Sequence, residues 1–494
     1  MSYLSVLVAG DSDQYTVPMA AAAESPLYER LAHDLGASIA KGQLRAGDRL
    51  PSVRRLARER SVSVATVLQA YFELENEGLV EVRPKSGHFV RRERGPELLE
   101  PSTPRRSSVP SEITVSAAVA ALVASVRDPN VIALGSAVMA PELLPIAKLN
   151  RILSEIAREM STAGAGYDAP PGLPTLRRQL ARRAVLTGLP LREDDFVTTV
   201  GAMEALHIAL RAVVRPGETI AIESPTYFGV MQLIEEMGIK ALEIPMHPRT
   251  GMDLDALEAG LKAGGIKAIF AMPTVSNPLG SVMPDENKRR LMSLLEKHDV
   301  PLIEDDVYGD LLFDGSRPAP VKALDRDGRV LYVGSVSKTL APGYRVGWIA
   351  AGRYQSTVER LKFTQSVATP TMPQMAVAEF LASGGYDRHL RKTRRLLSVQ
   401  VEKTREAIAR HFPAGTRVSA PRGGYVVWVE LPGNVSAFSI QRQALERGIS
   451  VAPGPIFSAG GRFENHLRLN AGVVWSERIE HSLEVLADIV KQSS

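Results

Sequence analysis

One short segment constrains the fold of this 494-residue chain more than any other. It begins with the apolar residues 330–333, which predict a buried strand, and continues through Ser335 and Ser337 to Lys338. Open α/β sheets bind ligands at the carboxyl ends of their strands, so Lys338 would stand at a ligand-binding edge. Its amine can form a Schiff base, and the two serines, with Arg345 seven residues further on, can hold a phosphate. A solvated surface position is the ordinary alternative for any lysine, and the surrounding pattern argues against it here.

Apolar runs of strand length alternate with helical patterns on both sides of this segment. We expect strands at residues 196–200, 219–222, 241–244, 268–272, 300–304, 330–334 and 346–350. Such alternation is typical of α/β folds with a mixed, mostly parallel sheet. The last part of the chain, residues 395–494, predicts a smaller α+β lobe that contains a strand at 424–431 and ends in a helix.

Polar side chains and helix-opening amides follow several of these strands. The residues placed at strand ends in this way are Ala202, Met203, Tyr227, Asn277, Asp305 and Tyr308. Amides at a helix start can cradle an anion, but a helix that opens on glycine is common, and so is a tyrosine in a loop. Each signal is therefore weak by itself. Because the carboxyl ends of parallel strands meet at one edge of a sheet, the segments together predict a single site there.

The bulk composition narrows the class of protein. The 45% of apolar residues is enough for a buried core, and the length suggests about three folding units. No apolar run approaches the ~20 residues of a spanning helix, and no basic segment precedes the early apolar patch at residues 4–9. The absence of cysteine excludes disulfides, thiolate metal sites and thiol catalysis. We therefore expect a cytoplasmic protein with no metal centre, and the net charge of +4 does not by itself indicate nucleic acid.

A stretch rich in arginine, proline and serine, residues 91–111, lacks any apolar period. Its prolines disfavour helix, and its composition is typical of an exposed, partly extended linker. We expect a tail at residues 1–24, a small module at 25–92, a linker at 93–113 and a large module at 114–494.

The small module has the pattern of three helices and a β-ribbon. Leu27 and the apolar residues after it step at helical spacing, Ser52 is suited to cap a second helix, and a third helix begins near Ser63. Two short strands follow at residues 79–82 and 88–91. This order of elements predicts a winged helix-turn-helix.

The Lys338 segment and the strand-end residues resemble class I/II aminotransferases, fold-type I enzymes that use pyridoxal 5′-phosphate (PLP), over nearly all of residues 114–494. The resemblance implies that Lys338 is the catalytic lysine, which holds the cofactor's aldehyde and then shuttles a proton. It implies ring contacts from Asp305 to the pyridine nitrogen, from Tyr308 and Asn277 to the ring hydroxyl, and from Tyr227 to the ring face. It implies phosphate contacts from Ser335, Ser337, Arg345 and the amides of Ala202 and Met203.

Three further residues take roles from the same resemblance. Tyr167 resembles the tyrosine that reaches a phosphate across a dimer interface, which implies a homodimer. Arg468 resembles the arginine that grips a substrate carboxylate, and Gly135 matches a glycine near the substrate. The sequence departs from the usual pattern at Leu279, where threonine more often precedes glycine, and at Glu204, where an amide residue is common. Neither departure removes a cofactor contact.

The small module closely resembles the GntR-type winged helix, from Leu50-Pro51-Ser52 through Thr66-Val67 to the wing at Ser86-Gly87. The resemblance implies DNA binding with the third helix in the major groove. Base-facing positions would be Ser63, Ala65, Thr66 and Gln69, and phosphate contacts would come from Arg54, Arg58, Lys85 and His88. Winged helices also mediate protein contacts, which is the alternative interpretation. Val64 and Leu68 are apolar where relatives carry polar or basic residues, so base recognition would depend on fewer polar groups.

Together, the two modules resemble the MocR-type transcription regulators of the GntR superfamily. The implied function is a DNA-binding regulator whose PLP domain senses an amino acid or related amine, with a double-stranded DNA operator as its partner. A second hypothesis is a working aminotransferase that carries a DNA-binding module, and a third is a repressor whose large domain binds nothing. Retention of Lys338, Asp305 and Arg345 argues against the third. Sensing and transamination need the same residues, so the first two hypotheses stay open.

Overall fold

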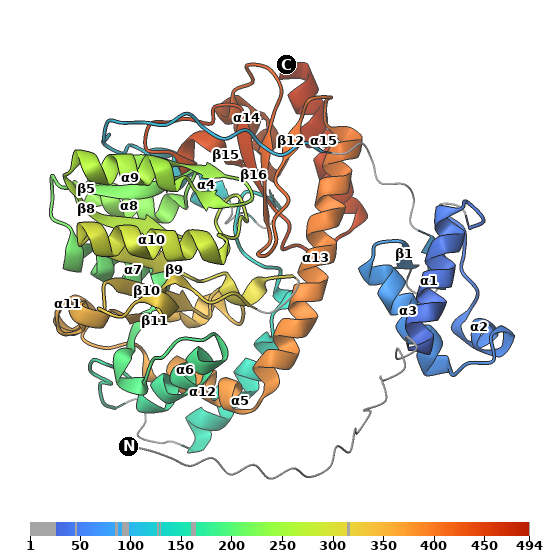
Figure 1. Cartoon of the computed structure of the whole chain (residues 1–494), viewed down its shortest axis with the longest axis horizontal. Coiled ribbons are helices and arrows are strands. Elements are labelled where there is room, and N and C mark those ends of the chain that lie inside the picture. The colour runs from blue at the N-terminus through green and yellow to red at the C-terminus, as the bar shows by residue number, and fades with distance from the viewer. Residues whose placement is uncertain are drawn as a thin grey trace, which may run out of the picture. The chain divides into compact units, whose positions relative to one another are not determined.

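The structure, a computed structural model, describes residues 26–44, 47–83, 87–90, 98–125, 128, 130–159, 165–313 and 317–493. The chain forms two compact units, Met1–Arg94 and Gly95–Ser494, which are considered separately (Figure 1). Within the described residues, no helix combines the length and the apolar character needed to cross a membrane.

The small unit is a winged helix-turn-helix, as predicted. Its elements are α1 (Leu27–Ala40), α2 (Val53–Glu59), α3 (Val64–Asn76) and the antiparallel strands β1 (Val80–Arg83) and β2 (Gly87–Val90). Ser52 and Ser63 cap α2 and α3, each accepting a backbone N–H with its side chain. Leu35, Leu56 and Tyr71 are among the buried residues that bring the three helices onto one core.

The large unit is built on an eight-stranded mixed sheet in the order β4-β11-β10-β9-β8-β5-β6-β7. The strands are β4 (Val197–Val200), β5 (Thr219–Ser224), β6 (Lys240–His247), β7 (Gly251–Met252), β8 (Ile266–Ala271), β9 (Leu302–Asp305), β10 (Val330–Ser335) and β11 (Val346–Ala350). The five strands from β10 to β6 run parallel to one another, whereas β11 and β7 run antiparallel to their neighbours. All seven strands predicted from the sequence are therefore present.

Helices and a second sheet complete the large unit. The helices are α4 (Ser116–Ser125), α5 (Ile146–Glu159), α6 (Pro174–Leu186), α7 (Gly201–Val213), α8 (Phe228–Glu236), α9 (Leu254–Ala263), α10 (Asp285–His298), α11 (Gln355–Ser366), α12 (Thr371–Ala382), α13 (Gly385–His411), α14 (Ala437–Glu446) and α15 (Glu477–Ser493). The second sheet, of the order β12-β13-β16-β15, comprises β12 (Arg417–Val418), β13 (Val426–Glu430), β15 (Ala452–Pro453) and β16 (His466–Asn470). A two-stranded parallel pair, β3 (Ile132–Ala133) with β14 (Ile449–Ser450), joins the start of the unit to this sheet's lobe.

The C-terminal lobe has its own hydrophobic core but no sharp start at residue 395. Strands β13 and β16 pack with α14 and α15 around this second core. Helix α13 passes through residue 395 without a break, because no proline and no interior glycine interrupts its helical pattern. Figure 1 shows α13 as one long helix that runs along the large unit from beside α12 to beside α15.

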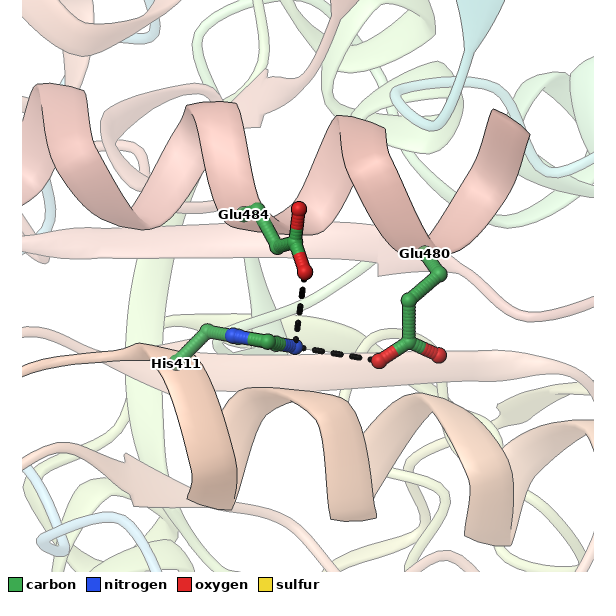
Figure 2. Close-up of side chains that lie close together, drawn as sticks. All are labelled: His411, Glu480 and Glu484. Atoms are coloured by element: carbon green, nitrogen blue, oxygen red, sulfur yellow. Dashed lines mark hydrogen bonds and ion pairs between the residues drawn. The ribbon is translucent and has the colours of Figure 1, made fainter. Parts of the chain in front are cut away.

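The carboxyl end of α13 is held against α15 by an ion-pair cluster (Figure 2). His411 Nε2 lies 3.0 Å from Glu480 Oε1 and 3.6 Å from Glu484 Oε1. Arg410 contacts the same Glu480 oxygen at 2.5 Å. A cation at the carboxyl end of a helix is favoured by the helix dipole. Because the Arg410 guanidinium already takes that oxygen, we interpret the cluster as a clasp between two helices rather than as a cation site.

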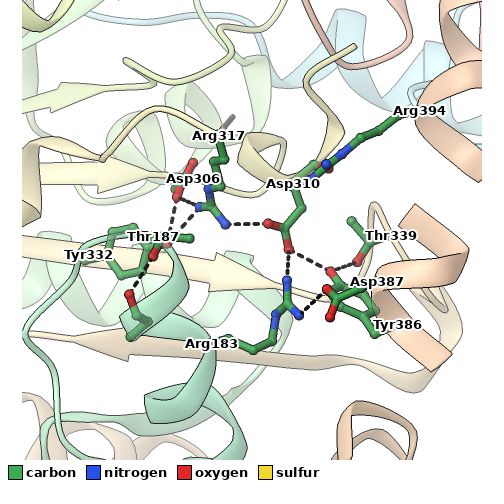
Figure 3. A network of polar contacts seen from close by, with 11 residues as sticks. Arg183, Thr187, Asp306, Asp310, Arg317, Tyr332, Thr339, Tyr386, Asp387 and Arg394 are labelled. Carbon is green, nitrogen blue, oxygen red and sulfur yellow. Dashed lines mark hydrogen bonds and ion pairs between the residues drawn. The ribbon is translucent and has the colours of Figure 1, made fainter. Parts of the chain in front are cut away.

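The amino end of α13 is held by a buried polar network (Figure 3). Tyr386 Oη lies 2.8 Å from Asp310 Oδ2 and 3.0 Å from Thr339 Oγ1. Asp310 also pairs with Arg183 at 3.4 Å and with Arg317 at 2.5 Å. Burial alone would raise the pKa of Asp310, but the two guanidiniums outweigh it and bring the pKa to about 2. The carboxylate is therefore ionised and shared by three neighbours.

Replacing this shared carboxylate should destabilise the large unit. We expect Asp310→Asn to lower the free energy of unfolding by about 3–5 kcal/mol, because two buried guanidiniums lose a common partner. The folded pKa of Asp310 lies below its ordinary value of 3.8, so this stability is present above that pH and is lost as the pH falls toward about 2. Denaturant titrations of both proteins between pH 7 and pH 2 measure the effect.

The matched control is Asp327→Asn, which removes an exposed carboxylate paired with Arg329 and should change stability by no more than ~1 kcal/mol. Equal unfolding free energies for Asp310→Asn and the control at neutral pH would show that the network carries no such load.

Candidate functional site

An open cavity of about 530 Å³ lies at the carboxyl edge of the large sheet. Its size is within the range of small-molecule sites. The structure brings together around it ten of the eleven residues predicted to bind the cofactor, namely Ala202, Met203, Tyr227, Asn277, Asp305, Tyr308, Ser335, Ser337, Lys338 and Arg345. The eleventh, Tyr167, is 84% exposed on this chain and does not line the cavity.

Lys338 follows the last residues of β10 and extends into the cavity. Its Nζ donates a hydrogen bond to the Ala137 carbonyl at 2.8 Å and lies 5.6 Å from the centre of the Tyr308 ring. Burial lowers the pKa of Lys338 to about 8, and the positive charge of Arg468 lowers it further, while Asp305 acts in the opposite sense. A substantial fraction of the amine is therefore unprotonated, and so nucleophilic, near neutral pH.

Asp305 and Tyr308 come from the end of β9 and the turn after it. Asp305 is 3% exposed, and its Oδ1 accepts the Val307 N–H at 3.1 Å. Burial raises the pKa of Asp305 to about 7, so a cationic partner in the cavity would be needed to keep it fully ionised. Tyr308 Oη is buried without a hydrogen-bond partner among the described residues. Both groups thus await a polar ligand at this point of the cavity.

The opposite end of the cavity is an anion cradle at the start of α7. Gly201 opens this helix with φ +73°, and a Cβ there would lie 2.4 Å from the Arg345 guanidinium. Arg345 Nη2 reaches the Val200 carbonyl at 3.3 Å and Nη1 reaches Ser337 Oγ at 3.4 Å. Only glycine allows the guanidinium to lie over the helix start. Free amides, serine hydroxyls and an arginine therefore converge where the helix dipole favours an anion.

The anion cradle is supported from below by a buried ion pair that the sequence did not indicate. Glu204 Oε2 accepts the Val200 N–H at 2.6 Å, and Lys362 Nζ, from α11, donates to the same oxygen at 2.7 Å. The Lys362 side chain is 1% exposed. Lys362 neutralises an acid that would otherwise stand, unpaired and buried, in the first turn of the anion-binding helix. The unusual Glu204 thus has its partner 158 residues further along the chain.

Arg468 enters the cavity region from the second sheet. It is fully buried, and its Nη2 donates to the Gly135 carbonyl at 2.6 Å while Nη1 lies 3.4 Å from Asn277 Oδ1. The guanidinium lies 5.0 Å from the centre of the Phe457 ring, and its Nε has no hydrogen-bond partner among the described residues. A buried guanidinium with spare donors is suited to bind a carboxylate. Arg468, from one lobe, and Lys338, from the other, therefore face a common ligand.

Some residues of the cavity were missed in the sequence. Leu206, Met272 and Val307 line it with apolar surface. Met272 was the final residue of a predicted strand, so its position at the sheet edge was available as a signal. Tyr425, whose Oη donates to the Ala137 carbonyl at 3.0 Å, lies beyond the reach of local pattern.

The predicted DNA-binding residues are placed less uniformly. Arg54, Arg58, Ala65 and Gln69 are exposed on α2 and α3. Ser63 and Thr66 are bonded to each other at the start of α3, with 2.8 Å between their hydroxyl oxygens. Val64 and Leu68 are 46% and 49% exposed, so this face of α3 carries apolar surface between its polar groups.

The wing departs from the prediction at His88. Its ring packs against Tyr71 with 4.6 Å between the ring centres, and this burial lowers the pKa of His88. The ring is therefore neutral at pH 7 and brings no charge to a phosphate, contrary to the role expected for it. The predicted contact from Lys85 lies outside the described residues.

Comparison with known proteins agrees with both units. The family model described as aminotransferase class I and II matches residues 129–486, and the model of bacterial regulatory proteins of the gntR family matches residues 27–90. An uncharacterized HTH-type transcriptional regulator of Escherichia coli, YjiR, is 38% identical over 94% of this chain and 98% of its own. The chain belongs to the MocR-type regulators of the GntR superfamily. As a member, it is a GntR-type DNA-binding regulator fused to an aminotransferase-like domain.

Solved structures resemble the large unit of this MocR-type regulator. The multiple substrate aminotransferase of Thermococcus profundus superposes with a TM-score of 0.71 at 28% identity, covering 77% of this chain and 96% of its own. The α-aminoadipate aminotransferase LysN of Thermus thermophilus, solved with N-(5′-phosphopyridoxyl)-L-leucine, gives a TM-score of 0.70 at 28% identity, covering 77% and 99%. The family and these neighbours imply pyridoxal 5′-phosphate as the cofactor.

The residues present fit that cofactor. The anion cradle matches a phosphate, the unpartnered Tyr308 hydroxyl matches a ring substituent, and a protonated pyridine nitrogen would supply the cationic partner that Asp305 lacks. When bound, PLP links to an amine and accepts electrons from the adjacent carbon. What the chain adds is position: Lys338 offers an amine, and Arg468 fixes a carboxylate beside it.

The support of the anion cradle can be tested through Lys362. We expect Lys362→Met to weaken PLP binding roughly tenfold, about 1.4 kcal/mol, because a buried Glu204 carboxylate without its partner would repel a phosphate dianion. Fluorescence or absorbance titration with PLP measures this affinity. Adding Glu204→Gln to Lys362→Met should restore most of the loss, since the repelling charge is then removed. If the single and double variants bound PLP equally, the effect of Lys362 would be on folding alone.

The DNA-facing residues predict two distinguishable phenotypes. Arg54→Ala should weaken binding to all DNA sequences and reduce the salt dependence by about one unit of log–log slope, because a phosphate contact is lost. Gln69→Ala should instead reduce the preference for the operator over unrelated DNA by about 1–3 kcal/mol. Filter-binding or anisotropy titrations at several salt concentrations separate the two. Binding by both variants that matches the unaltered protein would mean that another face contacts DNA.

Proposed function

We propose that this protein is a PLP-dependent transcription regulator that senses an amino acid or related amine and changes its DNA binding in response. The observation that carries the proposal is the pairing of Lys338 with Arg468. An amine and a fully buried guanidinium face one cavity from two lobes of a chain that also bears a winged helix. An amino acid presents the two complementary groups, an amine and a carboxylate, on one carbon.

The remaining assignments follow from this arrangement. Asp305, Tyr308, Asn277 and Tyr227 would hold the cofactor ring, and the anion cradle its phosphate. Tyr167, a large aromatic left 84% exposed, supports a homodimer in which it reaches the partner's cofactor. Two winged helices in such a dimer would bind two half-sites of one operator. Because DNA is the partner, we place the protein in the cytoplasm.

A second candidate function is transamination with full turnover. It is favoured by the intact set of ten cavity residues and by a lysine whose pKa of about 8 suits proton transfer near neutral pH. A sensor needs only to bind the amino compound, whereas an aminotransferase must also release a keto acid. The two functions therefore differ in turnover and in DNA response, not in residues.

One experiment separates these functions. Purified protein with PLP is titrated with each amino acid while its affinity for the DNA upstream of its own gene is followed, and keto acid release is assayed in parallel. We expect one amino compound to change DNA affinity at least fivefold, about 1 kcal/mol of coupling, without rapid turnover. Lys338→Ala should abolish that response, and Arg468→Ala should weaken it for compounds with a carboxylate only. Rapid turnover with constant DNA affinity would replace the sensor by the aminotransferase.

A further inference from the structure

Residues 98–112, called the strap below, run across the large unit without helix or sheet of their own. Most of their side chains are exposed, as a linker composition predicts, yet the chain is held at several points. Leu99 accepts the Val418 N–H with its carbonyl at 2.8 Å. Ser102 donates its N–H to Glu430 Oε2 at 2.7 Å and its hydroxyl to Glu430 Oε1 at 3.0 Å. These contacts fix the strap to the second sheet.

The same short segment is also fixed to the large sheet. Arg106 donates Nε and Nη2 to the two Asp253 carboxylate oxygens at 2.9 and 3.2 Å, a bidentate pair. Glu100 pairs with Arg249 at 2.8 Å. Near its end, the strap forms a two-way backbone pair between Ser111 and Ala241 of β6, with both bonds at 2.9 Å. Asp253 caps α9, and Arg249 lies between β6 and β7.

The strap therefore bridges the two lobes that also face the ligand cavity. Glu430, its anchor on the second sheet, pairs with His466 in the ladder of β13 and β16, and Arg468 lies two residues further along β16. The anchor and the carboxylate-binding arginine thus belong to one hydrogen-bonded ladder. Asp253 and Lys338, in contrast, belong to the large-sheet lobe. A ligand held by both Lys338 and Arg468 would join the two lobes from inside, as the strap joins them from outside.

The length of the strap limits how far its anchors can separate. Only four residue steps lie between Ser102 and Arg106, which span at most about 14 Å when extended. Pro104 lies within this stretch and restricts its conformations. A change in lobe spacing that a ligand imposes must therefore either move the strap or break one of its polar contacts. Residues 91–97 connect the strap to β2 of the winged helix, so such a change acts on the chain that carries the DNA-binding unit.

We propose that the strap transmits ligand binding to the DNA-binding unit: an amino compound held by Lys338 and Arg468 shifts one lobe against the other, and the strap contacts of Ser102 and Arg106 convert that shift into a change in DNA affinity. The inference rests on the proposed sensor function and names how that site is coupled to DNA. Without the contacts, the same segment would be a slack tether, and ligand binding would be silent at the DNA.

The test uses the full-length protein and a stable probe, N-(5′-phosphopyridoxyl)-L-leucine, which carries phosphate, ring and amino-acid carboxylate in one molecule. Hydrogen exchange of residues 98–112 is measured with and without the probe, because the Ser102 and Ser111 amides donate to the anchors. Affinity for the DNA upstream of the protein's own gene is measured in the same two states. The test variant is Ser102→Ala/Arg106→Gln, which removes two contacts on the surface.

The matched control is Arg290→Gln. Arg290 is also an exposed arginine, and it pairs with Asp255 and Glu258 of α9, the helix that Asp253 caps, but it makes no strap contact among those described. It therefore removes the same charge from the same neighbourhood.

We expect the probe to change exchange in the strap of the unaltered protein and to change its DNA affinity about fivefold or more. In Ser102→Ala/Arg106→Gln, probe affinity should stay within about twofold while the DNA response falls below about twofold, and Arg290→Gln should keep the full response. A full DNA response in the strap variant, or strap exchange that is unaffected by the probe, would overturn the coupling role and leave the sensor function standing. If the unaltered protein bound the probe or DNA in neither state, the proposed function would fail, and the strap's role with it.

Discussion

The alternation of side chains at the end of β9 is the constraint on which the site depends. Successive residues of a strand face opposite sides of the sheet, so Asp305 faces the ligand cavity while Asp306 faces the network behind it. Asp306 pairs with Arg317, and Arg317 with Asp310. The parallel register of β9 with β10, in which Asp305 lies opposite Val333, then places Lys338 at the same edge. One strand end thus serves both the cofactor chemistry and the packing that supports it.

The cavity is organised by charges that burial makes costly. Burial lowers the pKa values of Lys338 and Arg468 and raises that of Asp305, so each charged form is disfavoured until a counter-charge arrives. A molecule with a protonated ring nitrogen, a phosphate and a carboxylate supplies these counter-charges together. The same electrostatics explains why the Glu204–Lys362 pair is needed, because a second uncompensated anion beside the cradle would oppose the phosphate. Selectivity for an amino compound on PLP is therefore built into what the empty-handed groups lack.

The strands and the cofactor residues could be predicted from sequence because their signals are local. An apolar run and the polar residue that ends it lie within a few positions, as at Asp305 and Lys338. Contacts made by folding could not be predicted in this way: Lys362 meets Glu204 from a helix with no local signal for it, and α13 crosses the expected lobe boundary because helical pattern says nothing about which core a residue joins. His88 was misjudged for a related reason, since its burial against Tyr71 depends on packing between the wing and α3. The strap was recognised by composition as extended and exposed, but its anchors lie 147 to 328 residues away.

The difference between a sensor and an enzyme with the same cavity must then lie in what the ligand's binding energy does. In an enzyme, that energy is most useful when it is realised in the transition state of the reaction. In a regulator, it must be realised as a difference between two arrangements of the protein, because a ligand that binds both equally shifts nothing. A site whose two gripping residues stand on separate lobes meets this condition, since closure changes the spacing of those lobes. The contacts of Ser102 and Arg106 add a reason for that spacing to matter elsewhere, because they tie the lobes to the chain that continues into the winged helix.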